Sequence, residues 1–449
     1  MLGMEKNKTI CAISTPIGNG GISIVRMSGE KCLKILQKIT PLDVEKLEPR
    51  KLTLSKVHTE SFDEQALVVW FKAPFSYTGE DMVEIQCHGG IVIANGILNA
   101  LLKNGAVLAE SGEFTKRAFM NGKISLDKAE GVIDMINAQS EEAVKAGYSL
   151  LIGKLKEAVD EIQNSLTDCQ AKIEVALDYP EEDIDYSTTE EIKTELTEAN
   201  TKIQDLLKTA GTGRIVKNGI NVLILGKPNA GKSSLLNALV GYNRAIVTDI
   251  AGTTRDTIED VYNYKGMSFN VIDTAGIRDA ESIVEQIGIE RAEENVKNAD
   301  IILVVLDGSR PIEPDDQKIL AMVKDKVVMH VINKIDLPKK INRTFDRMVE
   351  VSALRREKVE RLKEDIYNLV VDQNMLNGGL LITNTRHVNA LQRASESIQS
   401  ALNEIEMGTS LDLAMPDIKS AWLALGEITG KNSNQEIINT IFSKFCLGK

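Results

Sequence analysis

The chain has 449 residues, of which 43% are hydrophobic and 26% charged, a composition typical of soluble globular proteins with two to four domains. Its net charge of −12 excludes a protein that binds nucleic acid through its overall charge, so any RNA contact must be local or shared with a partner. We expect a cytoplasmic protein without membrane segments, because the five cysteines are scattered, the apolar runs are too short for a bilayer and the sequence shows no secretion signal. The four histidines have no metal-binding spacing.

Residues 1–122 mix short strand-like runs with helix-like runs, which predicts an N-terminal α+β domain. Apolar and polar residues alternate over residues 82–88, which places Glu84 on the polar face of a strand. Arg26 follows the apolar run of residues 22–25 as a lone cation. From the residues alone, the simpler interpretation of Arg26 is a solvated side chain at the end of a strand.

From residue 123 to 218 apolar residues recur every three or four positions, which predicts amphipathic helices. Within this stretch, residues 209–214 resemble a linker because they are rich in glycine and threonine. Residues 219–372 alternate strand-like runs with helical stretches, the pattern of a parallel sheet with helices on both faces. Residues 373–449 are helical again. We therefore predict one discontinuous helical domain with an inserted α/β domain, with separate helical domains as the alternative.

The stretch GKPNAGKSS, residues 226–234, matches the phosphate-binding pattern G-x-x-x-x-G-K-[ST] between a predicted strand and a predicted helix. Its glycines let backbone N–H groups turn toward phosphate oxygens, and the helix N-terminus adds positive potential. Lys232 is expected to reach the β- and γ-phosphates of a nucleotide, and Ser233 is expected to bind Mg²⁺. The loop residues that we expect at the nucleotide are Asn229, Ala230, Gly231, Lys232, Ser233 and Ser234.

The stretch NKID, residues 333–336, follows another predicted strand and indicates guanine recognition. A carboxylate at Asp336 accepts hydrogen bonds from the ring N–H and the exocyclic amine of guanine. Adenine lacks this pair of donors, so such a site selects GTP over ATP. The predicted guanine side consists of Asn333, Lys334, Asp336, Ser352 and Ala353.

The stretch DTAG closes a further predicted strand, and TDIAGTTRD is the candidate first switch. We expect Asp273 in the Mg²⁺ shell, Gly276 near the γ-phosphate and Thr254 as the second Mg²⁺ ligand. Ile277 occupies the place of the glutamine that positions water in many GTPases, so either another residue does this or hydrolysis is slow. The remaining nucleotide-binding candidates are Thr248, Asp249, Ile250, Ala251, Gly252, Thr253, Thr274 and Ala275.

Together these motifs resemble one family over essentially the whole chain, the bacterial and organellar tRNA-modification GTPases called MnmE or TrmE. Outside the GTPase motifs the resemblance rests on TPIGNGGISIVRMSG, FSYTGEDMVEIQCHGG, GEFTKRAFMNGKISLDKAEG and the C-terminal FCLGK. It implies an N-terminal folate-binding and dimerisation domain at residues 1–122 and a discontinuous helical domain at residues 123–218 and 373–449. It also implies an inserted Ras-like P-loop GTPase domain at residues 219–372.

The resemblance implies a reaction as well as a fold. Family members are homodimers that act with the flavoprotein MnmG, in a heterotetramer, on tRNA. They attach an aminomethyl or carboxymethylaminomethyl group to C5 of the wobble uridine, with a one-carbon unit from a 5-formyl or 5,10-methylene tetrahydrofolate. Their GTP hydrolysis needs Mg²⁺ and is activated by K⁺ and by dimerisation of the GTPase domains, without an arginine finger.

The resemblance also assigns roles within the GTPase domain. The implied K⁺ ligands are Asn229, Thr248, Ile250 and Thr253. A cation beside the β- and γ-phosphates stabilises developing charge as an arginine would. Glu285 is the implied water-orienting residue, with a solvated glutamate at a helix start as the alternative. Lys232 and Arg255 are the other catalytic candidates in this domain.

For the folate, the resemblance implies contacts with Arg26, Glu84, Lys123 and Lys449. Glu84 can accept hydrogen bonds from pterin N–H groups, and the two lysines suit an anionic glutamyl tail. A lipidation box at Cys446 is disfavoured because Lys449 is not a usual final residue for one. We expect the tail to fold back to the folate site, where Cys446 either reacts covalently or only shapes the pocket or docks tRNA or MnmG.

Two other interpretations remain open at this point. A GTP-switch ribosome-assembly or RNA-binding factor would use its first domain only for interactions. Such factors usually carry a basic RNA-binding module, which this sequence lacks. A folate-binding one-carbon enzyme would use the GTPase domain purely for regulation.

Overall fold

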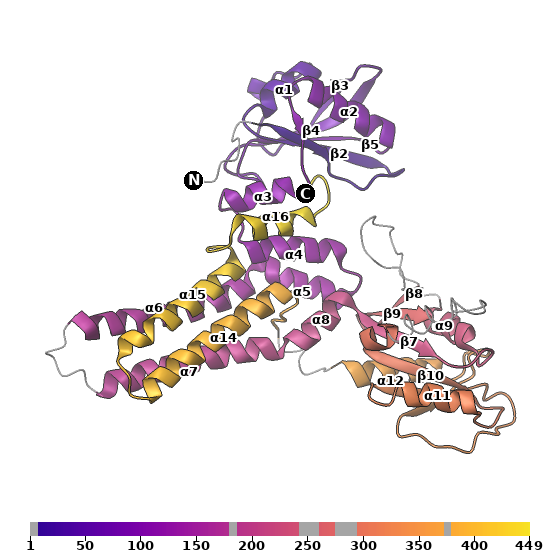
Figure 1. Ribbon diagram of the computed structural model, residues 1–449. Coiled ribbons are helices and arrows are strands. Elements are labelled where there is room, and N and C mark those ends of the chain that lie inside the picture. Colours follow the sequence, from indigo (N-terminus) through magenta and orange to yellow (C-terminus); the bar gives the residue numbers. More distant parts are fainter. Residues whose placement is uncertain (1–7, 179–185, 242–259, 274–293, 372–378) are drawn as a thin grey trace, which may run out of the picture. The chain divides into compact units, whose positions relative to one another are not determined.

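The computed structural model describes residues 8–178, 186–241, 260–273, 294–371 and 379–449 (Figure 1). Within it the chain divides into two compact units, each of which contains a six-stranded sheet. Unit 1 comprises Met1–Ile133, Leu150–Asn164 and Trp422–Lys449, and unit 2 comprises Asp134–Ser149 and Ser165–Ala421. In the described part of the chain, no helix is both long enough and apolar enough to cross a membrane.

The sheet of unit 1 has the order β3-β4-β5-β2-β1-β6, and every pair is antiparallel except the short pair β1–β6. Its strands are β1 Ile10–Ile13, β2 Ile22–Ser28, β3 Thr53–His58, β4 Asp63–Phe71, β5 Met82–His88 and β6 Val107–Leu108. Helices α1 (Cys32–Ile39) and α2 (Ile91–Lys103) pack on one face of this sheet, where the apolar residues of β5 join their core (Figure 1). Glu84 takes an alternate position on β5 and is only partly buried, as the alternation predicts.

The C-terminal end of the chain packs into unit 1. Helix α16 (Gln435–Ser443) and the residues after it contribute two phenylalanines to a small core shared with α4 (Leu126–Asn137). Gly448 has a left-handed φ of 88°, and a Cβ there would lie 2.3 Å from the carbonyl oxygen of Ile13. Because only glycine permits both features, Gly448 allows the tail to lie directly against β1.

Amphipathic helices occupy the middle and the end of the chain, as the apolar spacing predicts. They include α3 Glu113–Met120, α5 Glu141–Ile152, α6 Lys154–Asp178, α7 Tyr186–Lys208, α8 Ala210–Asn218, α14 Thr385–Glu406 and α15 Met415–Thr429. In unit 2, α14 lies along α7 (Figure 1), and the Ser395 hydroxyl of α14 lies 2.6 Å from Asn200 Oδ1 and 2.7 Å from Gln204 Nε2. These polar contacts set the register of an otherwise apolar helix pair.

The expected linker at residues 209–214 is wrong, because helix α8 begins at Ala210. Gly213 lies buried in this helix, and a Cβ there would lie 2.2 Å from the carbonyl oxygen of Ile382. The glycine therefore serves a close approach of two chain segments rather than a flexible connection. Sequence alone does not distinguish these two uses of glycine.

The sheet of unit 2 has the order β12-β11-β10-β7-β9-β8 and is parallel except for the pair β8–β9. Its strands are β7 Ile220–Leu225, β8 Asp260–Tyr264, β9 Met267–Asp273, β10 Ile301–Asp307, β11 Val328–Asn333 and β12 Met348–Glu350. Alternate residues of β10 enter two different cores, one with α9 (Lys232–Val240) and α12 (Val359–Val370), the other with α11 (Pro314–Met322). Both faces are thus covered, and the C-terminal strand ends meet at the edge where such sheets bind ligands.

Candidate functional site

The phosphate loop joins β7 to α9 at this edge of the sheet. Gly231 has a φ of 97°, and a Cβ there would lie 2.2 Å from the side-chain amide nitrogen of Asn333. Asn229 has a φ of 63°, a left-handed conformation that asparagine adopts more readily than most residues. The sequence of the loop is therefore matched to a backbone that turns tightly against a neighbouring strand end.

Lys232 is held against the backbone of the same loop. Its ammonium donates hydrogen bonds to the carbonyl oxygens of Gly226 at 2.7 Å and Lys227 at 3.0 Å. Ser233 and Ser234 follow it in the first turn of α9, where both are exposed. The loop thus presents one cation and two hydroxyl groups beside a helix N-terminus, which is the arrangement that the phosphates of a nucleotide require.

Asn333 connects the phosphate loop to the predicted guanine side. It is 2% exposed, and its Nδ2 donates to the carbonyl oxygen of Ala230 at 3.0 Å. Its Oδ1 accepts from the backbone N–H of Ala353 at 3.0 Å. Because one buried amide bonds to both segments, the structure brings these predicted residues together at one hydrogen-bonded junction.

Lys334 extends this junction and has a left-handed φ of 66°. Its ammonium donates to the carbonyl oxygen of Asn229 at 2.8 Å and to Asp307 Oδ2 at 2.6 Å. Burial raises the pKa of the Asp307 carboxyl, but hydrogen bonds from Lys334 and Ser309 outweigh it and hold that pKa below its usual range. Asp307 is not among the residues predicted from the sequence, although a carboxylate that ends the strand beside β7 was a usable signal.

Asp336 carries the carboxylate expected to select guanine. The Ser352 hydroxyl donates to Asp336 Oδ1 at 2.6 Å, and this hydrogen bond lowers the pKa of the carboxyl. The backbone N–H of Arg355 donates in turn to the Ser352 hydroxyl at 3.2 Å, which fixes its orientation. The carboxylate is therefore ionised at neutral pH, aimed by a buried serine and only partly covered.

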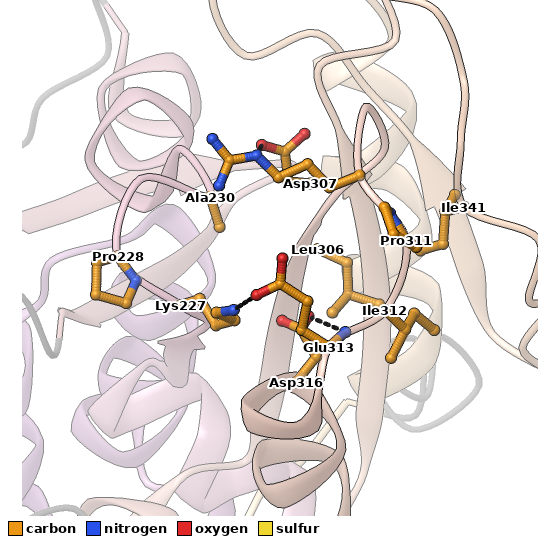
Figure 2. A pocket seen from close by; sticks show the side chains of 11 residues that line it. Lys227, Pro228, Ala230, Leu306, Asp307, Pro311, Ile312, Glu313, Asp316 and Ile341 are labelled. Atoms are coloured by element: carbon orange, nitrogen blue, oxygen red, sulfur yellow. Dashed lines mark hydrogen bonds and ion pairs between the residues drawn. The ribbon is translucent and has the colours of Figure 1, made fainter.

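A small cavity lies beside the start of the phosphate loop (Figure 2). Its volume is about 30 Å³, which leaves room for one or two water molecules and not for a nucleotide. Figure 2 shows Lys227 and Glu313 pointing toward one another in an ion pair, with the backbone N–H of Glu313 bonded to Asp316 Oδ2 at 3.0 Å. The cavity thus marks where the loop is tied to the start of α11.

Several predicted site residues lie outside the described residues. They are Thr248, Asp249, Ile250, Ala251, Gly252, Thr253, Thr254, Arg255, Thr274, Ala275, Gly276 and Glu285. Asp273 is the last residue of β9, the strand that pairs with β7. The described geometry therefore bears on the phosphate loop and the guanine side.

Unit 1 contains a second, larger cavity of about 620 Å³. All four residues predicted there from the resemblance line it: Arg26, Glu84, Lys123 and Lys449. The other lining residues are not among those predicted from the sequence; they are Arg50, Phe71, Phe75, Ser76, Tyr77, Met82 and Val132. Three aromatic side chains close to one another in the chain were the available signal for an apolar wall.

Arg26 and Glu84 form an ion pair across adjacent strands. They are register partners on β2 and β5, and Arg26 Nε and Nη2 lie 2.9 and 2.8 Å from Glu84 Oε1. Arg26 Nη1 also donates to the carbonyl oxygen of Gly448 at 3.2 Å, and the guanidinium lies 5.7 Å from the centre of the Phe114 ring. Arg26 is therefore a held side chain that joins the sheet to the tail, not a solvated strand end.

The tail brings its last residue to this cavity but leaves its cysteine outside the lining. The Ser14 hydroxyl donates to the Gly448 carbonyl oxygen at 3.1 Å, and the Gly112 N–H donates to the Cys446 carbonyl oxygen at 3.4 Å. Lys449 lines the cavity, whereas Cys446 is exposed and is not among the lining residues. These contacts hold the tail against the N-terminal strands, with Lys449 and not Cys446 at the cavity.

We expect Cys446 to be the one thiol of the five that reacts rapidly in the native protein. Burial raises the pKa of Cys11 and Cys169 to about 12 and of Cys87 to about 11, and it raises that of Cys32 well above its usual value. Titration with an aromatic disulfide reagent at about pH 8 should release one equivalent quickly, and five after denaturation. Cys446→Ser should abolish the fast phase, and a fast phase that survives this substitution would contradict the assignment.

Comparisons with known proteins cover the whole chain. Residues 9–123 match the family described as GTP-binding protein TrmE N-terminus, and residues 126–446 match the MnmE helical domain. The tRNA modification GTPase MnmE of Clostridioides difficile (strain 630) is 42% identical over 454 residues, covering 98% of this chain and 99% of that protein. The protein of the same name from Alkaliphilus metalliredigens (strain QYMF) is 42% identical over 464 residues, covering 99% of this chain and 100% of that protein.

A crystal structure of an Era variant from Aquifex aeolicus bound to GDP and AlF4− is similar to part of the chain. It is 27% identical and covers 39% of this chain and 66% of that chain, with a TM-score of 0.28, too low to define the fold. The two family matches and the two sheets confirm the predicted fold class. It combines a mixed N-terminal domain, a helical domain and a P-loop GTPase sheet.

Proposed function

Because the chain belongs to the MnmE family of tRNA modification GTPases, we propose that it is a K⁺-activated GTPase that modifies the wobble uridine of tRNA. It is a GTP hydrolase that acts in tRNA modification. In this proposal a homodimer works with the flavoprotein MnmG, in a heterotetramer, to install an aminomethyl or carboxymethylaminomethyl group at C5. The buried junction of Asn333 with the phosphate loop and the guanine side supports the GTPase part of the proposal, and the match of residues 9–123 to the TrmE N-terminus carries the tRNA-modification part.

The extent of the similarity separates this proposal from a ribosome-assembly factor. GTPase motifs alone are shared between the two kinds of protein. The match over residues 9–123 lies outside those motifs and belongs to the TrmE N-terminus. This part of the chain also supplies most of the lining of the large cavity, so an N-terminal domain that only mediates interactions is the weaker interpretation.

Each described residue of the nucleotide site has a separate part in this proposal. The Asp336 carboxylate accepts the N–H groups of guanine, and Lys232 exchanges its two backbone partners for phosphate oxygens. Mg²⁺, which neutralises phosphate charge, would be held by Ser233 with Thr254 and Asp273. The exposed hydroxyl of Ser233 next to Lys232 suits a cation that prefers oxygen ligands.

Asn229 is the described member of the proposed K⁺ site. A monovalent cation beside the β- and γ-phosphates supplies positive charge where negative charge develops. The left-handed φ of Asn229 and the hydrogen bond from Lys334 to its carbonyl oxygen hold this residue firmly at the loop. The remaining proposed ligands are Thr248, Ile250 and Thr253, with Glu285 to orient the attacking water and Arg255 as a further catalytic group.

Turnover of GTP in KCl is expected to exceed turnover in NaCl by about 10²-fold at matched ionic strength, since one well-placed charge has an effect of this order. Asn229→Gly should abolish most of this difference. Glycine removes the side-chain ligand but tolerates the left-handed φ of this position, so the loop keeps its shape. Steady-state phosphate release in both salts, with Mg²⁺ present, measures the effect.

Two controls accompany this experiment. Affinity for GDP, measured with a fluorescent analogue, should stay nearly constant in Asn229→Gly if the loop is intact. Equal and slow turnover of the unaltered protein in both salts would contradict K⁺ activation. It would leave GTP hydrolysis itself, and the family assignment, in place.

The cavity of unit 1 suits a tetrahydrofolate derivative, either 5-formyl or 5,10-methylene. Its volume of about 620 Å³ lies within the range of about 300–1,000 Å³ common for small-molecule sites. Lys123 and Lys449 offer cations to a glutamyl carboxylate. Arg26 bonds to Oε1 of Glu84, so Oε2 remains as an acceptor for a pterin N–H group. Because Cys446 is not among the lining residues, we favour a tail that forms a wall of the pocket over covalent chemistry at its thiol.

A further inference from the structure

A short surface segment of unit 2 is strongly basic although the chain as a whole is acidic. Residues 339–347, here called the basic segment, contain Lys339, Lys340, Arg343 and Arg347 against one carboxylate, Asp346. All four cations are exposed. The segment precedes β12, the edge strand of the sheet. It therefore contributes a local positive field to a molecule with a net charge of −12.

Three of these cations have no carboxylate partner among the residues that the structure describes. Lys339 forms an ion pair with Glu350 at 2.5 Å. The side chains of Lys340, Arg343 and Arg347 form no ion pair with any described residue. Many other exposed cations of the chain are paired with carboxylates three or four positions away along a helix. The positive charge of the basic segment is thus available to a partner.

The backbone holds this segment at both ends. The N–H groups of Lys340 and Ile341 both donate to the carbonyl oxygen of Gly308, at 2.8 and 3.3 Å, and Ile341 is 3% exposed. The carbonyl oxygen of Arg347 accepts from the backbone N–H of His330 at 2.9 Å. The cations therefore project from an anchored strip of chain, which lowers the entropy lost when a partner binds.

Aromatic stacking also restricts the side chains of the basic segment. The Phe345 ring lies 4.0 Å from the His330 ring, centre to centre, with an angle of 11° between the planes. The guanidinium of Arg343 lies 5.1 Å from the centre of the Phe345 ring. A guanidinium held over an aromatic ring keeps its charge and its donors while losing part of its freedom. Arg343 is thus a preorganised donor for a planar or phosphate group.

We propose that the basic segment binds the sugar-phosphate backbone of the tRNA substrate. The inference rests on the proposed function, because that function supplies the polyanion. The three unpaired cations are three and four residues apart, and an extended chain spans at most about 3.6 Å per residue. The Cα atoms of consecutive cations therefore lie within about 15 Å of one another along the segment, the scale of a few successive phosphates. A local contact of this kind is what an acidic protein needs to hold RNA.

The test compares two triple variants with the same change in net charge. K340Q/R343Q/R347Q removes the unpaired cations, and K145Q/K318Q/R361Q removes three exposed cations that are paired with Glu142, Asp315 and Asp365. Binding of an unmodified tRNA transcript to the full chain is measured from about 50 to 200 mM salt. The first variant should bind at least ~10-fold more weakly, and its log–log salt slope should fall by about two to three. The second should change the slope by less than one.

Further readouts separate the possible failures. GTP turnover should be unchanged in both triple variants, which shows that the domain is folded. Arg343→Lys keeps the charge and should leave the salt slope unchanged, while the loss of stacking on Phe345 lowers the affinity only in part. If K340Q/R343Q/R347Q binds tRNA as tightly as the unaltered chain, with the same salt slope, the inference is wrong while the proposed function stands. The basic segment would then be expected to bind an acidic protein instead of tRNA. If the unaltered chain neither binds tRNA nor modifies it together with MnmG, the proposed function fails as well.

Discussion

Asp336→Asn is expected to lower the affinity for GTP by about 10⁴-fold, since a site built to pair a polar edge rejects a mismatched partner by this order. The substitution replaces one acceptor of the carboxylate with an amide donor, which then faces the exocyclic amine of guanine. Xanthosine triphosphate has a carbonyl oxygen at that position, so its affinity should rise in the same variant. Competition between the two nucleotides against a fluorescent GDP analogue measures both changes.

The control for this experiment is Asp325→Asn, which removes an exposed carboxylate from the same domain and should leave both affinities unchanged. If Asp336→Asn bound GTP and xanthosine triphosphate in the original ratio, the carboxylate would not be the selecting group. The phosphate loop would still bind a nucleotide, so this outcome would overturn the guanine assignment without affecting the loop.

The same carboxylate predicts a pH dependence. The hydrogen bond from Ser352 lowers the pKa of Asp336, so the charged form persists as the pH falls below the usual range of an aspartate. GTP affinity should therefore be lost only when the pH passes below this lowered pKa. Ser352→Ala removes the hydrogen bond, raises the pKa and should move the loss of affinity to higher pH. Nucleotide titrations across the acid range test the direction of this shift.

Lys232→Ala is expected to reduce the rate of GTP hydrolysis by about 10²–10³-fold, the cost of removing one charged donor from a developing anion. The other lysine of the loop, Lys227, is held in an ion pair with Glu313, and the residues next to Lys232 present backbone groups and serine hydroxyls. The substitution also removes two hydrogen bonds to loop carbonyl oxygens, so affinity should fall together with turnover. Single-turnover measurements at saturating GTP separate the two effects.

Lys318→Ala is the matched control because it removes an exposed lysine of α11 that is paired with Asp315. Its turnover and affinity should equal those of the unaltered chain. If Lys232→Ala kept its rate at saturating GTP and lost only affinity, the lysine would bind ground state and transition state equally. Its proposed role in catalysis would then be wrong, and its role in binding would remain.

The sequence by itself was sufficient for the features that depend on local order. The glycine positions and the lysine at the helix start identify the phosphate loop, and strand-like runs that alternate with helical stretches identify the parallel sheet. Each of these signals lies within a few neighbouring residues. The same holds for residues 333–336, because the residue types alone predict that they recognise guanine. The prediction of a linker at residues 209–214 is wrong because it rested on local composition alone. Gly213 is required by the close approach of a segment distant in sequence, near Ile382.

Only the tertiary structure decided which residues meet across long stretches of chain. Asn333 joins the phosphate loop to Ala353, and Asp307 holds Lys334, by hydrogen bonds that no sequence spacing encodes. Arg26 is a lone cation in the sequence, but the fold places it between Glu84 and the C-terminal tail. Such contacts arise when packing closes the chain on itself, so residues remote in sequence become neighbours. The sequence therefore determined which chemical groups the protein carries, and the fold determined which of them act together.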